Sequence, residues 1–122
     1  MGWILKAPDG ADLSVNVWNW RPTLALLARD AVLDAEKLEM LGSNGHWQIT
    51  PAEAERVAAF LDVYLSKVPA GGRVRLDGVI TTQVDTFEFY RDDLARNYSA
   101  TVDWLAQLRD FCRLATGGFT VG

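Results

Sequence analysis

The chain has 122 residues, a net charge of −4 and 49% apolar residues, which predicts one globular domain spanning residues 1–122. Its acidity argues against direct binding of nucleic acid or of an anionic membrane surface. The single cysteine, together with the lack of a recognisable secretory leader or long apolar run, predicts a cytoplasmic protein.

The amino-terminal segment predicts a β-hairpin. Residues 3–6 form the first expected strand, and Pro8-Asp9-Gly10 has the chemistry of a turn. Residues 13–18 alternate between apolar and polar side chains, as in a half-buried strand. We expect Leu13, Val15 and Val17 to face the core and Arg21-Pro22 to end this strand.

Two helices and a short strand are expected next. Pro22 suits the first turn of a helix that continues to Val32 at helical spacing. Asp34 is expected to cap a second short helix, followed by Gly42 in the left-handed conformation. Residues 47–49 form either a short strand or a packed segment.

Thr50-Pro51-Ala52-Glu53 predicts a helix that begins with a capping box. The Thr50 hydroxyl can accept a hydrogen bond from the backbone N–H of Glu53, whose carboxylate can accept one from the N–H of Thr50. One stripe of this helix is apolar: Val57, Phe60, Leu61, Tyr64, Leu65 and Val68. Residues 69–72 are expected to end it.

The remaining chain alternates strands with helical segments. Residues 73–77 predict a strand, which 79–82 either extend or pair with, and 87–89 predict a further strand or extended segment. A helical turn is expected at 94–97, then a last helix capped by Ser99 with an apolar arc from Val102 to Ala115. Gly117-Gly118 ends that helix, and residues 119–121 suit an edge strand.

These elements predict an α+β fold, with a small, mostly antiparallel sheet and three or four helices packed on it. The first two strands should pair, and the last two long helices should cover one face of the sheet.

The segment Trp18-Asn19-Trp20-Arg21 concentrates the residue types that recognition surfaces favour. On a strand, Trp18 and Trp20 would share the face opposite Val17. The two indoles then either pack between sheet and helices, with Arg21 bonded to a helix end or a carboxylate, or form an exposed patch that binds a protein, or line a ligand pocket.

Four carboxylates crowd into residues 85–93: Asp85, Glu88, Asp92 and Asp93. They form a solvated loop, or steer a basic protein partner, or hold a metal ion or serve acid–base chemistry. No second acidic motif accompanies them, and we predict no metal site.

We predict no catalytic residue and no cofactor. Cys112 falls on an apolar arc, which indicates a buried thiol rather than a nucleophile. His46 lies in a glycine-flanked loop, where it either acts as a general base or bonds its own loop.

Three segments resemble a group of small bacterial proteins of undescribed function: Trp18-Asn19-Trp20-Arg21-Pro22, Asn97-Tyr98-Ser99, and Phe111-Cys112-Arg113 with Gly117-Gly118-Phe119. The resemblance implies no reaction, cofactor or site. It implies only that the two ends of the chain form one structural unit.

The main hypothesis is a non-enzymatic cytoplasmic binding protein, an inhibitor or immunity-type protein that neutralises a protein partner. Trp18, Trp20 and Arg21 would anchor the partner beside Asn19 and Tyr90, and the four carboxylates would steer a basic one. The alternative is a small carboxylate- and histidine-based enzyme or ligand-binding domain, with a pocket near Trp18, Trp20, His46 and Tyr90. A third hypothesis is a homo-oligomer that pairs edge to edge through an exposed stripe including Phe119 and Val121.

Overall fold

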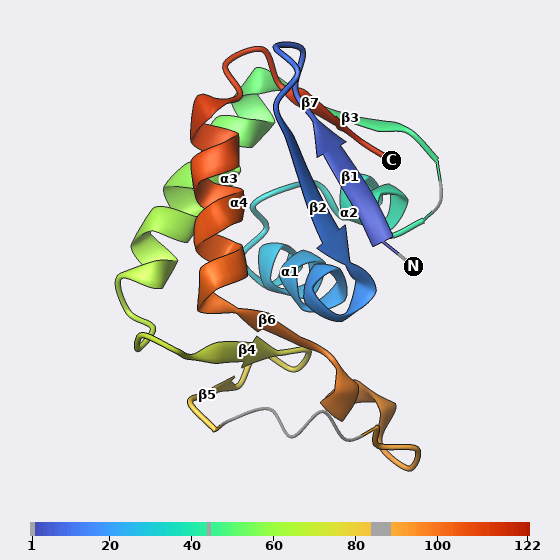
Figure 1. The fold of residues 1–122 in the computed structure, drawn as a ribbon, viewed down its shortest axis with the longest axis vertical. Coiled ribbons are helices and arrows are strands. Elements are labelled where there is room, and N and C mark those ends of the chain that lie inside the picture. Colours follow the sequence, from blue (N-terminus) through green and yellow to red (C-terminus); the bar gives the residue numbers. More distant parts are fainter. Residues whose placement is uncertain (1, 44, 84–88) are drawn as a thin grey trace.

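A computed structural model describes residues 2–43, 45–83 and 89–122, and within these ranges the fold is α+β, as predicted (Figure 1). The helices are α1 (Val17–Arg29), α2 (Ala35–Leu41), α3 (Pro51–Leu65) and α4 (Val102–Leu114), with one 3₁₀ turn, η1 (Leu94–Asn97). The larger sheet has the order β2 (Asp12–Asn16), β1 (Gly2–Lys6), β7 (Phe119–Val121), β3 (Trp47–Ile49). The smaller sheet has the order β5 (Ile80–Thr81), β4 (Arg73–Arg75), β6 (Ser99–Thr101).

The larger sheet has one buried face. β1 and β2 form the predicted antiparallel hairpin, in which Trp3 pairs with Val15. Side chains alternate along the strands, so Trp3 and Leu5 are buried whereas Ile4 and Lys6 are exposed. The buried residues of this sheet join those of the four helices in a single apolar cluster, and α3 and α4 lie side by side (Figure 1).

The last strand lies in the middle of the larger sheet, so the prediction of an edge strand is wrong. β7 pairs with β1 on one side and with β3 on the other. Phe119 is 4% exposed and Val121 is fully buried. The stripe that was expected to pair copies edge to edge is therefore part of the core.

The first helix begins earlier than predicted. Asn16 is its N-cap, with Oδ1 accepting a hydrogen bond of 2.9 Å from the backbone N–H of Asn19. The helix therefore starts at Val17, and Pro22 lies inside it rather than in its first turn. Alternation to Val17 favoured a longer strand, but the amide of Asn16 satisfies a helix terminus at that point.

Other helix termini agree only in part with the sequence. The capping box of Thr50 and Glu53 is confirmed. Asp34 occupies the N-cap of α2 without a capping hydrogen bond from its side chain, and Gly42 has φ −84°, so it is not left-handed as predicted. Thr101 caps α4 in place of Ser99, which lies in β6 opposite β4.

The segment before β6 decides one open alternative and confirms one prediction. Residues 79–82 return rather than extend the preceding strand, because β5 pairs antiparallel with β4, and the helical turn at 94–97 is present as η1. The strand expected at 87–89 lies largely outside the described residues. Within the described ranges, no helix combines the length and the apolarity that crossing a bilayer requires.

Candidate functional site

Aromatic rings from two distant parts of the chain meet at the amino-terminal end of α1. The Trp18 ring lies 5.0 Å from that of Tyr98, tilted by 38°, and 6.4 Å from that of Phe89, edge to face. Trp18 is 41% exposed and Phe89 is 60% exposed. This partly wet group is unusual, because large aromatic side chains are generally covered in a folded monomer.

Two guanidinium groups lie over tyrosine rings in this part of the structure. The Arg21 guanidinium lies 5.3 Å from the centre of the Tyr98 ring, and that of Arg96 lies 4.1 Å from the centre of the Tyr90 ring. In the described part of the chain, no carboxylate oxygen lies within 4.0 Å of either guanidinium. We call these residues the aromatic–arginine surface: Trp18, Arg21, Phe89, Tyr90, Arg96 and Tyr98.

The side chains of two asparagines form hydrogen bonds that fix the backbone around this surface. Asn97 donates from Nδ2 to the carbonyl of Tyr90 (3.0 Å) and accepts at Oδ1 from its N–H (2.8 Å). Asn19 accepts at Oδ1 from the backbone N–H of Thr101 (3.1 Å), which ties α1 to β6. Asn19, predicted as a binding residue, therefore positions the elements that carry the surface.

Trp18 and Trp20 point to different environments, contrary to the prediction that they share a face. Trp20 is 3% exposed and donates from Nε1 to the carbonyl of Leu41 (2.9 Å). Its ring packs against those of Trp3 and Trp104, with centres 6.3 and 6.4 Å away. Residues two apart on a helix lie about 200° apart around its axis, so burying Trp20 turns Trp18 toward solvent.

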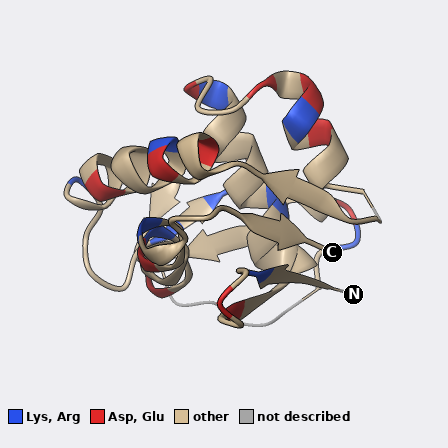
Figure 2. Ribbon diagram, turned by 90° about the horizontal axis from the view of Figure 1, so that it is seen from above, with Lys and Arg blue, Asp and Glu red and all other residues tan. Residues whose placement is uncertain are grey.

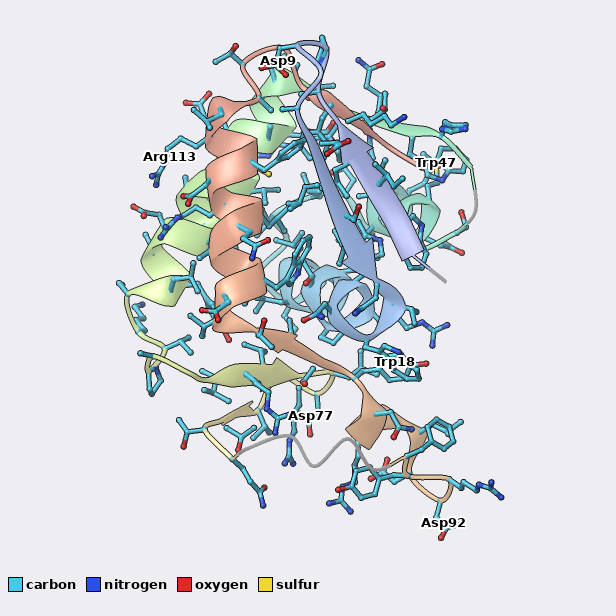
Figure 3. All side chains as sticks on the ribbon, viewed as in Figure 1. Asp9, Trp18, Trp47, Asp77, Asp92 and Arg113 are labelled. Atoms are coloured by element: carbon cyan, nitrogen blue, oxygen red, sulfur yellow. The ribbon has the colours of Figure 1, made fainter. Side chains whose placement is uncertain are left out.

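Asp92 and Asp93 are exposed beside the aromatic–arginine surface. Figure 3 shows Asp92 at the lower end of the molecule, opposite Asp9, on the segment that continues into η1. A hollow of about 370 Å³ lies here, lined by Phe89, Tyr90, Arg91, Asp92, Asp93 and Arg96. Asp85 and Glu88 lie outside the described residues.

His46 belongs to a different part of the molecule. It is exposed in the loop before β3, next to Gly122. Its neighbour Trp47 is well separated from Trp18 in Figure 3. The structure therefore does not bring His46 to Trp18 and Tyr90, as the hypothesis of an enzyme pocket requires. Across the described ranges, no three His, Cys, Asp or Glu side chains gather as metal ligands would.

The thiol of Cys112 is buried at 3% exposure, and this burial raises its pKa to about 12. The neighbouring Arg113 donates to Asp62 (3.1 Å) rather than stabilising a thiolate. Cys112 lines a hollow of about 460 Å³ between α3 and α4, which the sequence did not predict. A neutral thiol of this kind is a poor nucleophile at neutral pH.

Charges of both signs are interspersed along the helices, whereas the strands carry few (Figure 2). Asp62 on α3 accepts a hydrogen bond from Arg113 of α4 (3.1 Å) and forms an ion pair with Arg109 of the same helix (3.6 Å). These exposed pairs contribute little to stability individually. The negative charge of Asp62 is thus compensated by the two arginines where α3 and α4 meet.

The sequence did not identify Phe89, Arg96 and Tyr98 as members of the surface. Tyr98 is 80 positions from Trp18, and only the packing of α1 against β6 brings their rings together. The segments that resemble small bacterial proteins include Trp18 and Tyr98, but the resemblance assigned neither residue a role.

Comparison of the chain with protein-family models, curated proteins and solved structures finds no match. The resemblance to small bacterial proteins therefore stays a prediction. The pairing of β1 with β7 agrees with its one implication, that the two ends of the chain form one unit.

Proposed function

We propose that the protein is a non-enzymatic, cytoplasmic binding protein that neutralises a protein partner by covering it, as an inhibitor or immunity-type protein does. The observation that supports this most is the aromatic–arginine surface. Trp, Tyr and Arg are the side chains that contribute most to binding energy at protein interfaces, and here they lie together and partly exposed.

The surface is well suited to binding because it is already ordered. The Trp18 ring packs on Tyr98, and the amide of Asn97 closes the backbone at Tyr90 with two hydrogen bonds. Side chains held in this way lose less conformational entropy on association than mobile ones do. Trp18 and Phe89 can therefore act as anchors, whereas Trp20, which the sequence suggested as an anchor, serves the core.

The carboxylates of Asp92 and Asp93 lie at the margin of this surface, where exposed charges influence the rate of association more than the final affinity. We propose that they steer the partner during encounter. Neutralising both should therefore slow association at low ionic strength and change the dissociation rate little.

The test is calorimetric titration of the purified protein with the purified products of neighbouring genes. We expect one of them to bind, and Trp18→Ser to weaken that binding about 30-fold, since anchor residues contribute about 2 kcal/mol or more. Leu114→Ser is the matched control, because Leu114 is 77% exposed on α4, outside the surface. The proposal is wrong if no product associates, or if Trp18→Ser lowers only the stability of the fold.

A further inference from the structure

The aromatic–arginine surface has a definite order of side chains. Arg21 stacks on Tyr98, Tyr98 packs on Trp18, and Trp18 meets Phe89 edge to face. The chain continues from Phe89 to Tyr90, on which Arg96 stacks. The surface thus combines exposed aromatic rings with two guanidinium groups, each of which lies over a tyrosine ring.

These two arginines differ from most others in the chain. Arg109 and Arg113 bond to Asp62, as an ion pair between helices. Arg29, Arg56 and Arg73 donate to backbone carbonyls, which use their fork of N–H groups. Arg21 and Arg96 have no such acceptor within the described ranges, apart from a long contact of 3.5 Å between Arg21 Nη1 and the hydroxyl of Tyr98.

A guanidinium that lies over a ring can still direct N–H groups away from that ring. It can then donate two parallel hydrogen bonds to a carboxylate, while the ring stabilises the positive charge. An isolated cation at the surface attracts any anion weakly, but two cations beside exposed apolar rings select a partner that offers both carboxylates and an apolar side chain.

We infer that the partner contacts this surface with an apolar side chain and two carboxylates. This inference rests on the proposed function, because it specifies the partner of the same surface. It concerns local contacts rather than total charge, so a partner that is basic overall still fits it. Trp18 and Phe89 would receive the apolar side chain, and Arg21 and Arg96 would each bind one carboxylate.

The experiment uses a phage-displayed library of short random peptides, selected on the wild-type protein after depletion on the Trp18→Ser variant. We expect enrichment of peptides that combine Trp, Phe or Leu with two Asp or Glu residues. Arg21→Gln and Arg96→Gln should each weaken the best peptide about tenfold or more, the effect of losing a hydrogen bond to a charged group.

Two control variants separate geometry from charge. Lys67→Gln also removes one positive charge, from an exposed position just beyond α3, and should leave peptide affinity unchanged. Arg21→Lys retains the charge but not the bidentate fork, so it should recover only part of the affinity.

The outcomes distinguish the inference from the proposed function. Peptides that depend on Trp18 but are basic or neutral, or that are indifferent to both arginine substitutions, overturn the inference and leave the proposed function standing. If no peptide prefers the wild-type protein to Trp18→Ser, both are overturned, because the surface then has no binding capacity of its own.

Discussion

Asn19 offers a direct test of how the surface is held in place. Its Oδ1 accepts from the N–H of Thr101 at 3.1 Å, and its Nδ2 donates to Oδ1 of Asn16 at 3.1 Å. Asn19→Ala removes both hydrogen bonds without introducing a larger side chain. The first bond joins α1 to the residue that caps α4, so its loss acts on two helices and on β6.

The size of the effect follows from the burial of each group. The N–H of Thr101 is partly buried, and leaving such a donor without an acceptor costs about 1–3 kcal/mol. The bond to Asn16 is exposed, and its loss costs less. Alanine has a higher helix propensity than asparagine, which restores about 0.5 kcal/mol. We therefore expect a net loss of about 1–2 kcal/mol in the free energy of unfolding.

Urea denaturation followed by far-UV circular dichroism measures this loss. With a typical dependence on urea for a small domain, the midpoint should fall by about 0.5–1 M. Asn19→Asp is the matched variant, because it keeps an acceptor for Thr101 and places a negative charge near the amino terminus of α1. It should lose less than half as much stability as Asn19→Ala. Equal losses in the two variants, or a change below about 0.3 kcal/mol in Asn19→Ala, would refute the reasoning.

Four further outcomes are expected. Thr23→Val should lower the free energy of unfolding in urea by about 1–3 kcal/mol, because the hydroxyl of the fully buried Thr23 accepts a hydrogen bond from Nε1 of Trp104 at 2.9 Å. The loss should be smaller in a Trp104→Phe background, which lacks the donor, and an equal loss there would contradict this account. Partial burial opposes the charge on Glu53, but hydrogen bonds from Thr50 and Lys37 outweigh this effect and lower the pKa of the carboxyl below 4.5. The carboxylate therefore stabilises the fold above pH 4.5, and the stability advantage of wild type over Glu53→Gln should disappear as the pH falls below that value. An advantage that persists at about pH 2 would argue against this account. Cys112 should react with a thiol reagent at pH 8 only after unfolding, so rapid labelling of the native protein would contradict its raised pKa and burial. Gly118→Ala should cost at least about 2 kcal/mol in thermal or urea unfolding, because Gly118 has φ +76° and an added Cβ would clash with the carbonyl oxygen of Ile49; a neutral effect would show that the turn adjusts freely.

Local patterns predicted the elements whose signals are local. The capping box at Thr50 was recognisable because its hydrogen bonds join residues only three positions apart. The hairpin of β1 and β2 was recognisable from its alternation and its turn. Gly42 shows the limit of such rules, since a glycine after a helix permits the left-handed conformation without requiring it.

Errors arose where one local signal outweighed another, or where tertiary contacts decided between alternatives. The alternation up to Val17 fits a strand, yet the side chain of Asn16 caps a helix at this point. Residues 119–121 lack any local feature that distinguishes an edge strand from a central one, because the choice depends on where β1 and β3 lie.

The candidate site was predictable only in its amino-terminal half. Trp18 and Arg21 were recognised by their residue types, and Tyr90 was named among the predicted binding residues. Their common location with Phe89, Arg96 and Tyr98 depends on the docking of β6 against α1. A pattern in one segment carries no information about a contact that spans most of the chain.

The place of β7 between β1 and β3 has a consequence for biosynthesis. Leu5 leaves the ribosome well before Val121, its neighbour in the sheet. Until β7 emerges, the hairpin of β1 and β2 lacks the strand that pairs with β1 on its other side. Folding of the larger sheet should therefore be slow for a domain of this size, as is usual where sequence-distant strands must meet.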